Sequence, residues 1–118
     1  MDGLTIRKAQ RKVERFLRER GWLIKTSLGR YYTLSHTMEE LGEVARCITV
    51  LESKRSEIMG VSKKDILENL KFEIGDLMYH VLKLACVYDI DAEVAFMKSM
   101  NKNEMKFPVE RFKKFKQF

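Results

Sequence analysis

Apolar residues recur every three or four positions along most of this chain, the spacing that places side chains on one face of an α-helix. The period is clear in four segments, residues 5–20, 35–51, 62–88 and 92–103. One proline and six glycines leave few natural breaks in 118 residues, and seven methionines with few β-branched runs also favour helix over strand. The pattern predicts an all-α protein of four to five helices.

Residues with known capping preferences stand at several of the expected helix ends. Gly21 follows the first helix, where a left-handed residue commonly ends a helix. Ser62 and Asp65 have the spacing of a capping box at the start of the third helix, although Asp replaces the usual Glu or Gln. The acidic residues 89 and 91 separate the third helix from the fourth and are expected to cap the fourth.

Three stretches lack the helical period and are expected to be non-helical. Residues 23–33 predict an irregular, partly aromatic loop, with the second helix starting near Ser35 or several residues earlier. Residues 52–64 predict a connecting loop, and Pro108 marks the start of an extended basic tail. No repeat, low-complexity tract or linker is visible, so residues 1–118 are expected to form a single domain.

Composition describes a globular protein, with 45% hydrophobic and 34% charged residues. No apolar run approaches the length of a membrane span, and the N-terminus lacks a signal-peptide core. Cys47 and Cys86 lie in apolar periodic segments without metal-ligand spacing, so they are expected to be small buried hydrophobes in a reducing compartment. These features predict a cytoplasmic protein.

The net charge of +6 is unevenly distributed, because residues 1–30 and 104–118 are net positive and residues 31–103 net negative. A basic total often indicates nucleic-acid binding. An acidic centre with basic surroundings equally suits a polyphosphate bound through metal ions.

Two pairs of carboxylates lie in the acidic centre, Glu40 with Glu43 and Glu73 with Asp76. Residues three apart share one helix face. A single pair of this kind is ordinary on a solvated helix, but here both pairs lie roughly 80° and 140° from the centre of their helix's apolar stripe, on the same side. Solvated faces have no reason to match in this way.

The acidic faces continue along each helix into apolar residues, which shield the carboxylates from water. Crowded carboxylates repel one another and need cations or protons between them. Mg²⁺ suits such oxygen ligands. A di-iron site is disfavoured because no Glu-x-x-His motif occurs, and His80, one turn from Asp76, is expected to support the site or the core rather than bind metal.

These motifs resemble those of the MazG-type all-α nucleoside triphosphate pyrophosphohydrolases. EELGE at residues 39–43 and EIGD at residues 73–76 are similar to the family's EExxE…ExxD pair. The segments QRKVERFLRERGW at residues 10–22 and NEMKFP at residues 103–108 are similar to the family's opening helix and to its Asn-x-x-Arg-Tyr-Pro ending. The resemblance covers most of the chain.

The resemblance implies a helical subunit whose bundle is completed by oligomerisation, as a homodimer or a homotetramer. It implies hydrolysis of a nucleoside or deoxynucleoside triphosphate to the monophosphate and pyrophosphate, with Mg²⁺ or substitute Mn²⁺, in a role such as nucleotide-pool housecleaning. The implied metal ligands are Glu40, Glu43, Glu73 and Asp76, which are catalytic together with a supporting Glu39. The implied substrate-binding residues are Trp22 at the base pocket and Lys102, Asn103 and Lys106 at the phosphates.

Some positions depart from the family pattern or allow another interpretation. Lys106 replaces an arginine and so lacks its bidentate fork, and the role of Lys98 is open. From its position after a helix, Trp22 is expected to be a core anchor more often than a ligand platform. The alternative function is a non-catalytic helical module that binds nucleic acid through the Arg-rich first helix and KKFK at residues 113–116. A purely structural helix bundle is a third possibility.

Overall fold

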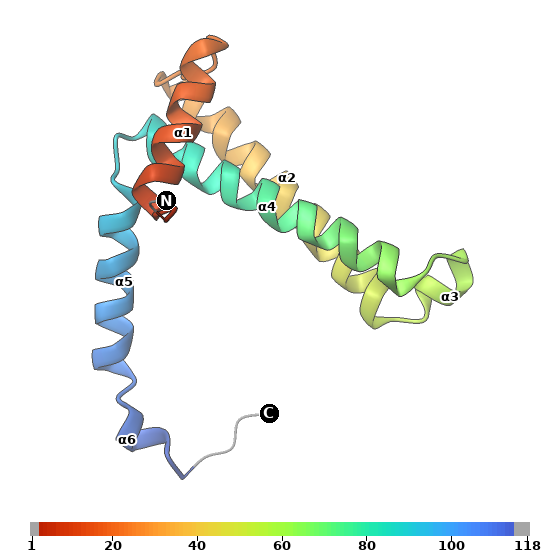
Figure 1. Ribbon diagram of the computed structural model, residues 1–118. Helices are drawn as coiled ribbons and strands as arrows, with labels where there is room; N and C mark the ends of the chain where they lie inside the picture. The colour runs from red at the N-terminus through yellow and green to blue at the C-terminus, as the bar shows by residue number, and fades with distance from the viewer. Residues whose placement is uncertain (1–2, 115–118) are drawn as a thin grey trace.

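The computed structural model describes residues 3–114, and every regular element in that range is an α-helix (Figure 1). In order, the elements are α1 (Ile6–Glu19), α2 (Ser27–Glu52), α3 (Arg55–Met59), α4 (Lys63–Val87), α5 (Ala92–Lys106) and α6 (Val109–Phe112). The predicted all-α class is confirmed. No helix in the described range is both long and apolar enough to cross a membrane.

The centre of the fold is the pair formed by α2 and α4. They lie side by side and run in opposite directions, because α3 and its flanking turns reverse the chain between them (Figure 1). α1 packs across the C-terminal part of α4, and α5 contacts α1 and then extends away from the pair. A compact chain of this length has a radius of gyration of about 13.5 Å, whereas this one has 18.1 Å. The subunit is therefore open.

The helix ends expected at Gly21, Ser62 and Asp91 are confirmed. Gly21 has a φ of 70°, the left-handed conformation that suits glycine after α1. The hydroxyl of Ser62 accepts a hydrogen bond from the backbone N–H of Asp65 at 3.2 Å. The carboxylate of Asp91 accepts the N–H groups of Glu93 and Val94 at the start of α5. A side-chain N-cap of this kind stabilises a helix by about 1 kcal/mol.

The turn between α4 and α5 is attached to α1 through a bracket of hydrogen bonds. The amide of Gln10 donates to the carbonyl of Ile90 at 2.6 Å and accepts the N–H of Ala92 at 2.8 Å. The guanidinium of Arg7 donates to Asp91 at 3.0 Å. The direction in which α5 leaves the fold is thus set from α1.

The predicted loop over residues 23–33 is wrong from Ser27 onwards, because α2 begins there, which agrees with a start several residues before Ser35 and not with a start near it. The hydroxyl of Thr26 caps the helix by accepting the N–H of Gly29 at 3.2 Å. A Cβ at position 29 would come within 2.4 Å of the carbonyl oxygen of Ile24. Gly29 is therefore a helical residue and not part of a loop. It lacks a side chain where the backbone of Ile24 passes close to the helix.

Two other expected loops contain short helices. Residues 52–64 include α3, which ends at Gly60 with a φ of 68°. Pro108 does not begin an extended segment, because α6 follows it directly. The end of the KKFK segment lies outside the described residues.

The buried core of the subunit is small. Its apolar members are Leu17, Val44, Val50, Ile66, Cys86 and Val87. Burial is thus confirmed for Cys86, whereas Cys47 is half-buried.

The apolar stripes predicted to face the core are largely exposed in the single chain. Met38 and Leu41 on α2 are 65% and 56% exposed, and Met78 on α4 is 60% exposed. The helical period predicted an apolar face on each helix, and within one chain these residues of that face are left uncovered. Val44 on α2 and Ile66 on α4 are buried, so each stripe is covered in part and exposed in part.

Candidate metal centre

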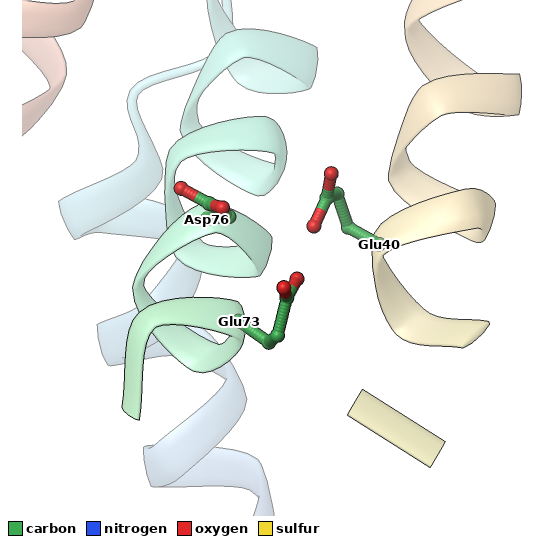
Figure 2. A group of neighbouring side chains, drawn as sticks. All are labelled: Glu40, Glu73 and Asp76. Carbon is green, nitrogen blue, oxygen red and sulfur yellow. The ribbon is translucent and has the colours of Figure 1, made fainter. Parts of the chain in front are cut away.

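The antiparallel packing of α2 and α4 brings three of the predicted carboxylates together. Glu40 reaches across from α2, while Glu73 and Asp76 lie one turn apart on α4 (Figure 2). Each offers a carboxylate oxygen, and these three oxygens all lie within 4.8 Å of one another. Since the two α4 residues are three apart, they share a face that α2 approaches directly.

The environment of this group disfavours three free negative charges. Glu40 Oε2 is buried and has no hydrogen-bond partner among the described residues. The pKa of Glu73 is raised, chiefly by a hydrogen bond with Glu40, then by desolvation and by the charges of Glu40, Asp76 and Glu43. A buried, unpartnered carboxylate oxygen is unfavourable unless a proton or a cation satisfies it.

Glu43 and Glu39 lie outside the group of three. The carboxylate of Glu43 points towards Arg46, at 4.0 Å, although its charge still acts on Glu73. Glu39 is exposed on α2. The structure thus brings together three of the four predicted metal ligands, and the ligand role of Glu43 and the supporting role of Glu39 stay predictions.

Replacing Glu73 by Gln is expected to stabilise the metal-free protein in a pH-dependent way. Because the folded-state pKa of Glu73 lies above its usual 4.5, ionisation of this group destabilises the fold as pH rises through the raised pKa. With a metal chelator present, the Tm of Glu73→Gln should exceed that of the wild type at pH 7–8. This difference in Tm should vanish when the pH falls below the usual pKa of a glutamate. Thermal melts from pH 4 to 8 measure this.

Glu68→Gln is the matched control, since Glu68 lies on the same helix and pairs with Lys71 at 2.9 Å. It should show no such gain at high pH. A gain for Glu73→Gln that is equal at pH 4 and pH 8 would contradict the expected repulsion.

A pair of histidines lies one helical turn beyond the carboxylates. His80 Nδ1 is 2.8 Å from the carbonyl oxygen of Asp76, a contact in which the ring nitrogen donates. The rings of His80 and His36 meet edge to face, with centroids 6.3 Å apart. Sequence reasoning considered only His80. His36 is found by the same spacing, because it stands four residues before Glu40.

Trp22 is 51% exposed, so its expected role as a core anchor is wrong. Its ring meets the edge of Phe16 at 5.9 Å, and Phe16 in turn meets Tyr79 at 5.8 Å. Tyr79 contacts His80 at 4.8 Å. A row of aromatic rings therefore leads from Trp22 across α4 to the turn above the carboxylates.

The predicted phosphate-binding residues Lys102, Asn103 and Lys106 are exposed on α5. This helix extends away from α2 and α4 (Figure 1). A single chain therefore does not bring them to the carboxylates. Lys98 is exposed on the same helix and its role stays open.

The basic first helix offers fewer free cations than its sequence suggests. Arg7 contacts Asp91, Arg18 contacts Glu14 at 3.2 Å, and Arg20 lies over the ring of Phe16. These groups are already engaged within the chain, which weakens the argument for a nucleic-acid module.

Comparison with known proteins agrees with the acidic motifs. A family model described as the MazG nucleotide pyrophosphohydrolase domain matches residues 30–109, which include both acidic motifs, residues 39–43 and 73–76. Searches of curated proteins and of solved structures found no match. With most of its length covered by the family model and an acidic group shared between two antiparallel helices, this chain belongs to the MazG nucleotide pyrophosphohydrolase family.

Proposed function

We propose that this protein hydrolyses a nucleoside or deoxynucleoside triphosphate to the monophosphate and pyrophosphate, with Mg²⁺ as cofactor and Mn²⁺ as a substitute. The observation that carries the proposal is the group formed by Glu40, Glu73 and Asp76, with its unpartnered buried oxygen, in a chain of this family.

The donor set fits a hard divalent cation. All of the grouped ligand atoms are carboxylate oxygens, which Mg²⁺ and Mn²⁺ prefer, and no cysteine or histidine belongs to the group. A cation there also satisfies Glu40 Oε2. When bound, it neutralises phosphate charge and makes a water a better nucleophile at neutral pH.

The residues of the chain supply position and orientation. Glu40, Glu73 and Asp76 hold the cation, with Glu43 as a fourth ligand after a rotation of its side chain away from Arg46. His80 is oriented by its bond to the Asp76 carbonyl, so its other ring nitrogen is the one that can contact substrate or water.

We further propose that the enzyme is an oligomer, a homodimer or a dimer of dimers. A compact monomer of 14.0 kDa exposes about 6,700 Å², whereas this chain exposes 9652 Å². The extra exposed area, about 3,000 Å² per chain, is of the order that obligate interfaces bury. Two α2–α4 pairs that join through their exposed stripes make a four-helix bundle.

The same assembly accounts for the distant α5 residues. Lys102, Asn103 and Lys106 lie far from the carboxylates of their own chain, so in an oligomer they act on the site of another copy. Lys106 would then place a cation at the phosphates of the bound nucleotide.

A panel of nucleotides tests the proposed activity. The folded protein is incubated with Mg²⁺ and each NTP and dNTP, and monophosphate and pyrophosphate are measured in equal amounts. Activity should disappear in EDTA and return with Mg²⁺ or Mn²⁺. If none of the triphosphates is cleaved by folded, metal-loaded protein, or if orthophosphate is released in place of pyrophosphate, the proposal is wrong.

A further inference from the structure

Lys83 lies on the same line of α4 as Asp76. The two residues are seven apart, which on an α-helix brings them to within about 20° of one another at an axial distance of about 10.5 Å. His80 lies between them. Helical side chains lean towards the N-terminus of their helix, so the stem of Lys83 leans back towards His80 and Asp76.

The neighbours of Lys83 on α4 place it in a wedge between α1 and α2. On one side, Tyr79 meets Phe16 of α1, and Cys86 lies 3.8 Å from the Gln10 carbonyl. On the other side, His80 meets the ring of His36 on α2. By the helical period, Lys83 lies on the surface of α4 between the residues that contact α1 and the residue that contacts α2. It is half-buried.

The charge of Lys83 is unpaired within the described part of the chain. Within residues 3–114 it makes no ion pair and no hydrogen bond, unlike Lys71 on the same helix, which pairs with Glu68 at 2.9 Å. Burial lowers the pKa of the Lys83 ammonium. Partial burial of an unpaired cation is unfavourable, and an anion that enters the wedge relieves it.

The wedge lies on the path that a nucleotide would occupy. One end is the carboxylate group, and the aromatic row through Tyr79 and Phe16 leads to Trp22 at the other. On each helix the side chains lean towards the N-terminus of that helix. Because α2 and α4 are antiparallel, the side chains of Glu40 and Lys83 lean towards the same turn of α4, the one that carries His80. A ligand whose anionic part is bound through a metal ion at the carboxylates would therefore meet the Lys83 ammonium on the side of His80 away from them.

We propose that Lys83 is a substrate-binding residue that contacts a phosphate oxygen of the nucleotide whose metal ions are held by Glu40, Glu73 and Asp76. This inference rests on the function proposed above. The ligand class is a nucleoside polyphosphate, and Lys83 supplies a point charge with three donors to it.

The test measures binding without turnover. Non-hydrolysable α,β-imido deoxynucleoside triphosphates of the four common bases are titrated by calorimetry in Mg²⁺ into the wild type, Lys83→Met and Lys83→Arg. Loss of one charged hydrogen bond weakens binding by roughly tenfold to a hundredfold. We expect this for Lys83→Met, with partial recovery in Lys83→Arg and an equal rise in KM for hydrolysis.

Two controls separate binding from folding. Lys71→Met removes a lysine from the same helix and should leave the Kd unchanged. The Tm of metal-free Lys83→Met should be no lower than that of the wild type, because an unpaired, half-buried charge has been removed. Lys83→Gln repeats the measurement with a polar side chain if the methionine variant aggregates.

The outcomes are distinct. If the wild type binds and cleaves nucleotides and Lys83→Met or Lys83→Gln binds them equally well, Lys83 is not part of the site and the proposed function stands. If a lower Tm accompanies an unchanged Kd, the role of Lys83 is structural and the inference is wrong. If the wild type neither binds nor cleaves any triphosphate, both proposals fail.

Discussion

Replacing Glu40 by Gln is expected to reduce the rate of pyrophosphate release by about a hundredfold or more. Glu40 is the only member of the carboxylate group that α2 contributes within the described residues, and its Oε2 atom is buried without a partner. Loss of about 3 kcal/mol of metal-derived transition-state stabilisation corresponds to a rate effect of that size. Pyrophosphate release at saturating nucleotide and Mg²⁺ measures the effect.

The same variant should respond differently to metal. Wild-type Tm is expected to rise with Mg²⁺ concentration, because the ion binds the folded state alone, and Glu40→Gln should lose most of this rise. Glu68→Gln, in the same fold but outside the group, should retain both activity and the metal-dependent rise. Full activity in Glu40→Gln would remove the carboxylate group from the mechanism.

Placing a charge on both apolar stripes is expected to separate the oligomer into monomers. Leu41 on α2 and Met78 on α4 are both more than half exposed in the single chain. Burial of a large apolar side chain contributes about 1.5–3 kcal/mol, and each substitution acts at every copy of the interface. The double variant Leu41→Lys, Met78→Lys should sediment as a monomer at concentrations where the wild type is a dimer or tetramer.

Activity should fall with the assembly, because in the proposed oligomer the α5 residues reach the carboxylates of another copy. Ile58→Lys is the control, since Ile58 is 83% exposed on α3, apart from the stripes. It should leave both the sedimentation coefficient and the activity unchanged. A wild type that is monomeric and fully active would contradict the proposed assembly.

Sequence reasoning was most successful where chemistry depends on spacing along one helix. The three-residue separation of Glu73 and Asp76 fixes their shared face, and the matching geometry of Glu40 on the other helix indicated a common point. Their proximity in the structure follows from the antiparallel packing of α2 and α4. The cap at Asp91 was predictable for the same local reason.

The remaining features depend on contacts that a periodic pattern does not contain. The early start of α2 involves the Thr26 cap and the close passage of Ile24 over Gly29, local contacts that hydrophobic periodicity does not encode. The pattern identified Leu41 and Met78 as apolar but could not show that both stay more than half exposed in the single chain. Trp22 was interpreted as a core anchor from its position after a helix, but among the described residues its ring meets only that of Phe16, which is itself exposed.

The bracket that joins Gln10 to the α4–α5 turn has a mechanical consequence. α5 has 15 residues and is therefore about 22 Å long. The bracket holds it at its N-terminal end. A rotation of about 10° at its first residue displaces Lys106 by about 4 Å, more than the tolerance of a hydrogen bond. The position of the last turn of α5 thus depends on the Gln10 amide of α1. This amide lies a whole helix length from the phosphates that the last turn would contact.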